Sequence, residues 1–473
     1  MSEYVAYNRF KAYRCRTAVS LGCTRNFPVS DLPLILIPIQ MAGEAPALFA
    51  LGVGNLAGNL DVLSCPNPPD RDCQYSLLAQ AANAIKVVID QWQADQLLIP
   101  QMICQSDAAA TLMLAVFDRM AYINPDYSPP PIIKDIGQIM VFFNRRFERA
   151  DSSAVLSAPR TVCTLYATGQ DPHADTHLGA VVEWLQPDDG KIIARVKAAE
   201  NLPASASTDP DIDNKVLVPL VRDFYQANRN GDITSADQAQ QKIHDIMEAE
   251  VQRRYELILK AMFAVIKVPE STHAMSVASA DREQFKRHVN YVSSRHPPRG
   301  FSGSNGMVEF VHREVSHREA EVQCIQALGR QRAEARLTGE ILHGTIVNRR
   351  NTKRGRATII EYDVFTHQDR LRIRTGTALT LMGTDTKFDF NVLGLKRQAA
   401  GSLITLIMTV GMRKDGQPVV GQSVEFGPKF YFSRRTKFAR DRINSAGVHP
   451  TVSGSGVRGT DYLAIIRKLE ANQ

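Results

Sequence analysis

The sequence predicts an α+β multidomain protein with an N-terminal α/β layer, a helical middle and a small C-terminal β-barrel. Its 473 residues exceed what one compact core holds, which indicates two or three domains. Strand-length apolar runs alternate with helical patterns near the N-terminus, and short strands with Gly turns crowd together near the C-terminus. We expect an α/β domain over 1–150, a mostly helical domain with a helical hairpin over 151–336, a barrel over 337–430, and a basic tail, linker and terminal helix over 431–473.

Strands and helices are expected to alternate in the first domain. Two apolar runs joined through Gly and Pro indicate a buried hairpin, and the apolar residues after them keep helical spacing. Together these elements predict an α/β layer with a partly parallel sheet. The expected elements are strands at 34–39 and 48–54, a helix through 75–89 capped by Asp72 or Asp70, a strand at 97–100, and a helix that starts at Ser106 and Asp107.

Three patterns in the N-terminal half approach an enzyme or cofactor motif, and each departs from it. The glycines of 52–58 stand at i, i+2 and i+6, which is not the spacing of a dinucleotide-binding loop. His173 and His177 lack the intervening Glu of a zinc protease helix, so His177 is expected to begin a helix. Asp70 and Asp72 have no Lys two residues later and serve as cap or turn residues. We therefore predict no catalytic residue, metal site or cofactor.

Aromatic residues recur at every third position at the N-terminus and are interleaved with cations. Such rings can stack on bases while guanidinium groups pair with phosphates. In the alternative, which we expect here, an amphipathic first element packs its rings on the core. The residues are Tyr4, Tyr7, Phe10 and Tyr13, with Arg9, Lys11, Arg14 and Arg16.

Helices are expected through most of the middle domain. Residues 214–227 and 235–268 have helical periodicity and are separated by a turn sequence, which indicates an antiparallel hairpin with a capping box at Ser235 and Gln238. The apolar stripe of the second helix is expected to serve as core. Further helices are expected at 281–292 and 313–337, with an exposed loop at 293–306.

Six or so short strands are expected near the C-terminus. The first two indicate a hairpin with a basic tip, and the third alternates so that Arg372 and Arg374 share one face. The runs at 375–383 and 420–428 each contain a glycine, an alternating stretch and a closing glycine. This shared pattern indicates an approximate repeat of turn plus strand. Because no helical pattern intervenes, the segment predicts a small closed barrel. The expected strands lie within 337–347, 357–365, 371–375, 375–383, 388–395, 402–410 and 420–428.

The positive charge of the chain lies on its last third. Residues 338–473 contain 22 Lys and Arg against 11 Asp and Glu, a net of +11, which leaves 34 against 38, a net of −4, for residues 1–337. This asymmetry indicates an anionic partner, with nucleic acid as the first candidate and an acidic protein as the second. A solvated surface excess without a partner is the remaining alternative. The expected nucleic-acid-binding residues are Arg349, Arg350, Lys353, Arg354, Arg356, Arg372, Arg374, Lys429, Tyr431, Arg434, Arg435, Lys437, Phe438 and Arg440.

Cysteine usage and hydropathy predict a cytoplasmic chain without a membrane partner. The seven cysteines are odd in number, none forms a CxxC pair, and no signal peptide opens the sequence. Cys15 with Cys23 and Cys65 with Cys73 share an eight-residue offset, which we attribute to chance because zinc sites use shorter spacings. The longest apolar run, near 32–39, is too short to span a bilayer.

These observations predict a non-catalytic nucleic-acid-binding accessory subunit. It is expected to contact the phosphate backbone through the basic barrel and tail, beside a helicase or nuclease partner. One alternative is an unrecognised metal-dependent hydrolase or nuclease in the N-terminal domain, using acids such as Asp70 and Asp72. Another is a structural or assembly protein that self-associates. The amphipathic helix at 461–472 can dock on the chain itself or on a protein partner.

Overall fold

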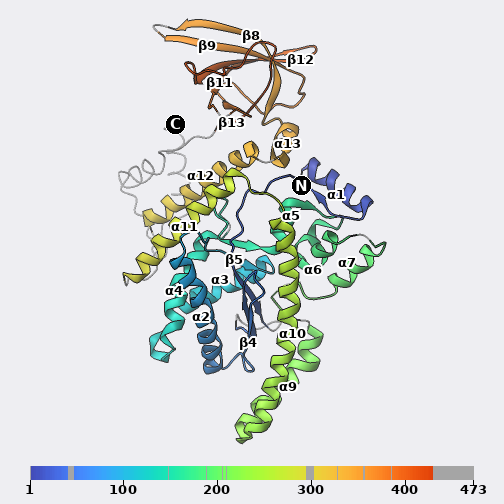
Figure 1. Ribbon diagram of the computed structural model, residues 1–473, viewed down its shortest axis with the longest axis vertical. Coiled ribbons are helices and arrows are strands. Elements are labelled where there is room, and N and C mark those ends of the chain that lie inside the picture. The colour runs from blue at the N-terminus through green and yellow to red at the C-terminus, as the bar shows by residue number, and fades with distance from the viewer. Residues whose placement is uncertain are drawn as a thin grey trace, which may run out of the picture.

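The protein is a mixed α and β molecule, seen here as a computed structural model. Figure 1 shows an elongated arrangement in which C-terminal strands lie at one end, a sheet lies between helices in the middle, and a helical hairpin projects at the opposite end. The N-terminus lies beside the junction between the C-terminal strands and the helices. The structure describes residues 2–40, 47–147, 149–187, 189–204, 206–208, 210–294, 303–327, 329–354, 357–384 and 386–429.

A five-stranded sheet organises the described N-terminal half. Its strand order is β4 (Leu60–Ser64), β3 (Ala50–Gly54), β2 (Leu34–Ile39), β5 (Met102–Cys104) and β6 (Val155–Ser157). The last three strands are parallel, and β3 and β4 add an antiparallel edge. The hairpin predicted for the first two apolar runs is therefore confirmed as β2 and β3. The sheet extends to Ser157, beyond the domain boundary expected at residue 150.

Helices cover both faces of this sheet. Side chains at alternate positions of β2 enter different cores: Leu34 and Leu36 join one cluster, and Ile35 and Ile37 join the other. Burial on both faces explains why β2 is apolar without interruption. One face carries α2 (Arg71–Ala94), α3 (Asp107–Ala121), α4 (Pro131–Arg146) and α11 (Thr272–Ser293), and the other carries α5 (Ala158–Leu165), α6 (Leu178–Leu185) and α10 (Ile233–Ile266).

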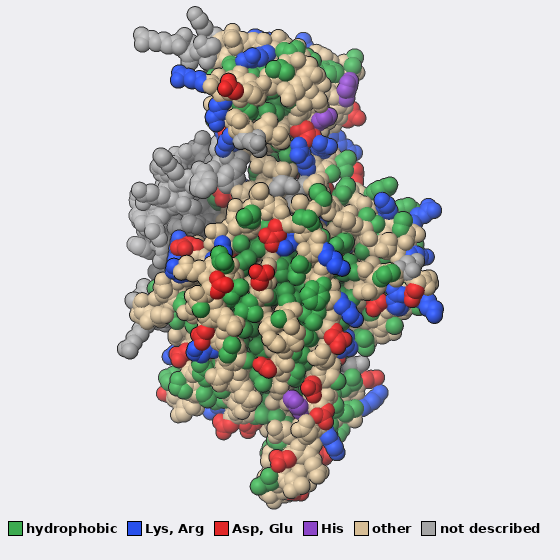
Figure 2. Space-filling view, viewed as in Figure 1, with side chains coloured by type: hydrophobic (Ala, Val, Ile, Leu, Met, Phe, Trp, Pro, Cys, Tyr) green, Lys and Arg blue, Asp and Glu red, His purple; other side chains and the backbone are tan. Residues whose placement is uncertain are grey.

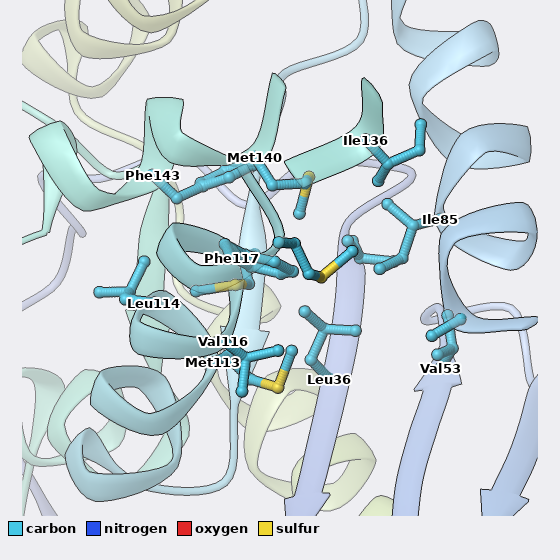
Figure 3. Packing of buried hydrophobic residues seen from close by; sticks show 14 of the residues in the cluster. Leu36, Val53, Ile85, Met113, Leu114, Val116, Phe117, Ile136, Met140 and Phe143 are labelled. Atoms are coloured by element: carbon cyan, nitrogen blue, oxygen red, sulfur yellow. The ribbon is translucent and has the colours of Figure 1, made fainter. Parts of the chain in front are cut away.

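The first of these cores is closely packed. In Figure 3, Leu36 of β2 points toward side chains of the covering helices, among them Phe117 of α3 and Met140 of α4. Ile85 of α2 approaches from the side of β3. Each fully buried side chain of this size contributes about 1.5–3 kcal/mol by leaving water. Each face of the sheet is thus covered by helices that lie near its strands in sequence and by one distant helix, α11 on one face and α10 on the other.

Two glycines of β3 allow α10 to approach the sheet closely. A Cβ on Gly52 would lie 2.5 Å from Cγ1 of Val251, and one on Gly54 would lie 3.2 Å from Cε2 of Tyr255. The Tyr255 hydroxyl donates a hydrogen bond of 2.6 Å to the carbonyl of Asn55, immediately after the strand. These glycines, whose spacing approached that of a nucleotide-binding loop, are therefore required for packing between helix and sheet.

The remaining N-terminal and middle elements surround this core. A short antiparallel pair joins the N-terminal segment to the chain after α5, and α9 packs along α10 as the predicted helical hairpin. Figure 1 shows this hairpin projecting away from the C-terminal strands. The elements are α1 (Glu3–Cys15), β1 (Val19–Ser20), β7 (Tyr166–Ala167), the 3-10 helices Pro125–Tyr127 and Pro172–Thr176, α7 (Ile192–Glu200), α8 (Pro210–Ile212), the π-helix Asp213–Leu217 and α9 (Val218–Asn230).

In the described part of the chain, six strands toward the C-terminus form one sheet that closes on itself as a barrel. β13 pairs with β8 on one side and with β10 on the other, and alternate residues of the strands, such as Ile404, Leu406 and Met408 of β12, fill the interior. The strand order around the barrel is β10 (Ala378–Leu381), β11 (Asp389–Gln398), β12 (Gly401–Val410), β9 (Ala357–Thr366), β8 (Leu342–Arg354) and β13 (Ser423–Pro428). Whether the barrel and the N-terminal half are separate domains stays a prediction.

Two helices, α12 (Gly303–Ala327) and α13 (Gly329–Thr338), connect the middle of the chain to the barrel. Buried Glu425 of β13 accepts a hydrogen bond of 2.7 Å from Nε of Arg332 and also pairs with Arg336, both on α13. On its other side, α13 receives a hydrogen bond of 2.7 Å from the Ser2 hydroxyl to Glu334. The helix therefore links the barrel to the N-terminal segment.

Several expected elements are placed differently by the structure. The strand expected at 97–100 is wrong: β5 begins at Met102, because Leu97 is an exposed turn residue whereas Met102 is fully buried. The strand expected at 371–375 is also wrong, because this segment has no ladder partner, although Ile373 is buried. The cap of α10 is Asp232, which accepts from the Ser235 amide, so the predicted capping box is wrong.

Two further boundaries differ from expectation. α13 continues to Thr338, so the strand predicted from residue 337 starts later, at Leu342. Helix α12 begins at Gly303, inside the loop expected over 293–306, whereas residues 295–302 lie outside the described residues. The two short strands β4 and β6 were not predicted, because each has only a few partly apolar residues.

We expect Gly52→Ala to destabilise the protein by about 1–3 kcal/mol, because the added methyl group overpacks the contact between β3 and Val251. The free energy of unfolding from urea titration measures the effect. Gly394→Ala in β11 is the matched control, since a Cβ there meets no atom within 4 Å and its stability should be unchanged within about 0.5 kcal/mol. Equal stability of the two variants would contradict the close approach of α10.

Candidate nucleic-acid interface

The cations expected at the tip of the barrel hairpin lie along β8 itself. Arg349 and Arg350 are paired with Tyr362 and Glu361 of β9, so the basic run is strand and the prediction of a basic turn from Arg349 is wrong. Because successive side chains of a strand project to opposite sides, Arg349 and Arg350 meet different neighbours. The side chains of Lys353 and Arg354 and the whole of Arg356 lie outside the described part of the chain.

Arg350 serves the barrel itself. Its Nε lies 2.7 Å from Glu361 and its Nη1 lies 3.1 Å from Asp363, which also accepts from the Thr405 hydroxyl at 2.8 Å. The hydrogen bond to Glu361 raises the pKa of the Arg350 guanidinium above its ordinary value. Because Asp363 is buried, removing this cation would leave a buried carboxylate with one partner fewer. Arg350 is therefore committed to the fold.

Arg349 is in a different situation. Its Nη2 donates a hydrogen bond of 2.6 Å to the side-chain oxygen of Gln417, and its guanidinium lies 5.9 Å from the ring centroid of Tyr362. Neither partner carries a charge. Arg349 is exposed, and among the residues that the structure describes no carboxylate forms an ion pair with it.

The other expected barrel cations also differ in how firmly they are held. Lys429 lies 3.1 Å from Asp389, a carboxylate that is only 1% exposed, so this cation neutralises a buried charge. Arg372 lies 3.0 Å from Glu340, where the Arg372 side chain is 68% exposed and that of Glu340 is 36% exposed, and pairs near the surface contribute only about 0–1 kcal/mol. Arg374 is exposed, and within the described residues no carboxylate pairs with it. The expected tail residues Tyr431, Arg434, Arg435, Lys437, Phe438 and Arg440, like the expected terminal helix at 461–472, lie outside the described residues.

A groove whose lining includes three arginines and three carboxylates lies where the barrel meets the N-terminus, and we call it the basic groove after its arginines. Its cations are Arg370, Arg372 and Arg397, of which Arg370 and Arg397 were not predicted, since neither stands in a strand that alternates with another arginine. The groove has a volume of about 480 Å³ and is also lined by Ser2 and Glu3 at the start of α1 and by the acids Glu334 and Asp369. The nearest acid to Arg370 is Glu3 at 3.7 Å, and both side chains are more than three-quarters exposed. This pairing is weak enough to be exchanged for another anion.

Helix α1 presents aromatic rings to solvent. Its buried face consists of the small or short side chains Val5, Asn8 and Ala12, whereas Tyr7 is 67% exposed and Phe10 is 58% exposed. The expectation that these rings pack on the core is therefore wrong, apart from Tyr4, which is partly buried. The spacing of three residues fitted a buried stripe equally well, and only the neighbouring elements decide which side of the helix faces inward.

The exposed stripe of α1 leads away from the basic groove. Glu3, Tyr7, Phe10 and Arg14 follow one another at intervals of four, three and four residues, which places them on one face of the helix. Glu3 lines the groove, and Arg14 lies 5.9 Å from the ring centroid of Phe10. We call Tyr7, Phe10 and Arg14 the aromatic stripe. In Figure 2, hydrophobic and basic side chains occur together where Figure 1 places α1.

A second ring and cation extend this surface at the end of α1. The guanidinium of Arg16 lies 4.6 Å from the ring centroid of Tyr13, which is 49% exposed. Arg9, by contrast, faces inward, where it pairs with Asp175 and donates to the carbonyl of Gln170 at 3.0 Å. Burial lowers the pKa of Arg9 from its ordinary value. Arg14 and Arg16 therefore accompany exposed rings, whereas the inward Arg9 accompanies a carboxylate.

Side chains considered for catalysis or metal binding serve local structure. Asp70 caps α2 by accepting from the Cys73 amide at 2.8 Å, and Asp72 lies exposed in the first turn of that helix. His177 caps α6 by accepting from the Ala180 amide, which confirms its expected role. Within the described residues, no group of three or more His, Cys, Asp or Glu is arranged to hold a metal ion.

Comparisons with known proteins give no likeness: no family model, curated protein or solved structure matches the chain. Across the described ranges, no helix has both the length and the apolar character that crossing a membrane requires. Function is therefore inferred from the geometry of the groove and of the aromatic stripe.

Replacing the exposed rings in Tyr7→Ala/Phe10→Ala should change the free energy of unfolding by no more than about 0.5 kcal/mol for each residue, because both side chains already face water. Urea titration of the double variant measures this. Ala12→Leu on the opposite, fully buried face of α1 is the control, and overpacking there should cost about 1–3 kcal/mol. A double variant as unstable as the control would show that the rings are core residues.

Proposed function

We propose that this protein is a non-catalytic nucleic-acid-binding subunit that holds single-stranded DNA or RNA between the base of its barrel and helix α1. The observation that supports it most is the continuity between the basic groove and the aromatic stripe through Glu3, which lines the groove and lies on the same face of α1 as the stripe. Cations that contact phosphates beside rings that stack on bases are the combination that single strands require. An enzyme partner such as a helicase or nuclease would supply catalysis.

The energetics favour the groove over Arg350 and Lys429, two of the other cations that were expected to bind. Arg350 and Lys429 each neutralise a buried carboxylate, so a phosphate would have to compete with a charge that the fold cannot expose. Among the described residues, Arg370 pairs with a carboxylate that is 77% exposed and Arg372 with one that is 36% exposed, and Arg397 adds a third cation beside them. A phosphate can replace these weak partners at little cost. Arg349 and Arg374 are further exposed cations of the barrel outside the groove lining, and the basic tail follows the barrel in the sequence.

The rings favour single strands over duplexes. Tyr7 and Phe10 are each more than half exposed, so their faces are open to unstacked bases. Stacking of one base on an aromatic side chain contributes about 1–3 kcal/mol and is tolerant of sequence. Bases in a duplex already stack on one another and offer no free face. The protein should therefore bind without strong sequence preference and should discriminate against double strands.

Binding to fluorescent single-stranded DNA, single-stranded RNA and a duplex, measured by anisotropy across a salt series, tests this function. For the better single strand, Tyr7→Ala/Phe10→Ala should raise the Kd by roughly tenfold or more at constant salt. Arg370→Ala/Arg397→Ala should lower the slope of log affinity against log salt by about 0.7 for each phosphate that the variant no longer neutralises. Duplex affinity should change little in the ring variant.

Tyr127→Ala is the matched control, because Tyr127 is also half exposed and lies under a guanidinium, that of Arg71 at 4.0 Å, but is remote in sequence from the groove. It should bind as the unmodified protein does. If the ring variant and this control bind equally well, α1 is not the contact surface. If no polynucleotide binds with salt-dependent affinity, the proposed function fails as a whole.

A further inference from the structure

Two cysteines that are eight residues apart have their sulfur atoms in direct contact. Sγ of Cys65 lies 2.7 Å from Sγ of Cys73. Both are free thiols, and Cys65 is fully buried whereas Cys73 is partly exposed. A disulfide has an S–S distance of about 2.05 Å, so the two sulfurs need to move by only about 0.7 Å to reach bonding distance. The contact therefore places two free thiols beside each other next to the central sheet.

Secondary structure fixes both sulfurs. Cys65 directly follows β4, and its amide donates to the carbonyl of Phe49 at 2.8 Å. Cys73 lies in the first turn of α2, and its amide donates to the N-cap Asp70. Between them the chain carries three prolines and a turn in which the Asp70 amide donates to Asn67 at 2.9 Å. This rigid connection holds the two thiols together without help from a ligand.

The two thiols differ in the way that a reactive pair requires. The hydrogen bond from the Cys65 thiol lowers the pKa of Cys73 to about 7, whereas its hydrogen bond to Cys73 raises the pKa of Cys65. Elsewhere burial raises the pKa of Cys163 to about 11 and also raises that of Cys104. Among these four, Cys73 is the thiol with thiolate character near neutral pH, and the thiolate is the nucleophile in oxidation.

We propose that Cys65 and Cys73 form a peroxide-reactive dithiol site that closes reversibly to a disulfide. The Cys73 thiolate attacks one oxygen of a hydroperoxide, the O–O bond breaks, and the departing hydroxide or alkoxide takes up a proton. Cys73 is then a sulfenic acid. The Cys65 sulfur loses its proton, attacks the Cys73 sulfur and displaces hydroxide, which leaves as water. With hydrogen peroxide, two thiols and one peroxide give one disulfide and two waters.

The bond would tie the end of β4 to the first turn of α2. It closes a loop of nine residues, and such a cross-link stabilises the folded chain mainly by restricting the unfolded one. Because Cys65 is already fully buried, the bond needs no repacking of the core. The oxidised protein should therefore unfold at a higher temperature than the reduced protein, by roughly 2–3 °C for a chain of this length.

Peptide mapping under non-reducing conditions tests the site directly. Arg71 lies between the two cysteines, so trypsin separates Cys65 in peptide 26–71 from Cys73 in peptide 72–86. After treatment of the reduced full-length protein with hydrogen peroxide, these two peptides should be recovered joined, with the loss of two hydrogens, and dithiothreitol should separate them. The rise in unfolding temperature should disappear with the same reductant.

Variants assign the roles of the two sulfurs. In Cys65→Ser, peroxide should leave Cys73 as a sulfenic acid that dimedone traps, whereas in Cys73→Ser the remaining Cys65 should stay reduced. Cys104, which is fully buried on the same sheet, should stay reduced in the unmodified protein. Recovery of both peptides as free thiols after peroxide treatment overturns the proposal, as does oxidation of Cys104 at the same rate as Cys73. None of these results depends on whether nucleic acid binds.

Discussion

Burial of the central sheet on both faces is the constraint on which the rest of the structure depends. Leu34 and Leu36 contribute to the core under α2, α3 and α4, while Ile35 and Ile37 contribute to the core under α5, α6 and α10. A strand in this position cannot tolerate a polar side chain on either face, because the group would lose water without gaining a partner. The helices after β3 and the much later α10 are thereby drawn to one sheet.

The same constraint explains local features of the sheet. Pro38 stands in β2 opposite Leu51 of β3, beyond the last residue that pairs with β5, so the missing amide hydrogen leaves no gap in a ladder. Gly52 and Gly54 have no side chains because α10 crosses β3 at van der Waals distance. Pro38, Gly52 and Gly54 are thus explained by strand pairing and by the close packing of helices on both faces of the sheet.

The candidate interface follows from how the barrel is attached. Arg332 and Arg336 of α13 hold the buried Glu425 of β13, and Glu334 of the same helix is bonded to Ser2. One helix thereby fixes the base of the barrel against the start of α1. The groove and the aromatic stripe are adjacent for this reason, although more than three hundred residues separate them in the sequence. Because α13 carries Arg332 and Arg336 on one side and Glu334 on the other, it holds the barrel and the start of α1 next to each other.

The sequence by itself determined the elements whose pattern is local: the hairpin of β2 and β3, the caps at Asp70 and His177, the long stripe of α10, and the run of C-terminal strands. Only the tertiary structure decided what each surface faces. Arg350 was expected to meet phosphate but meets Asp363, and Tyr7 was expected in the core but faces water. Periodicity fixes which residues share a side of a helix or strand, whereas contacts between segments far apart in the chain determine whether that side is covered, neutralised or exposed.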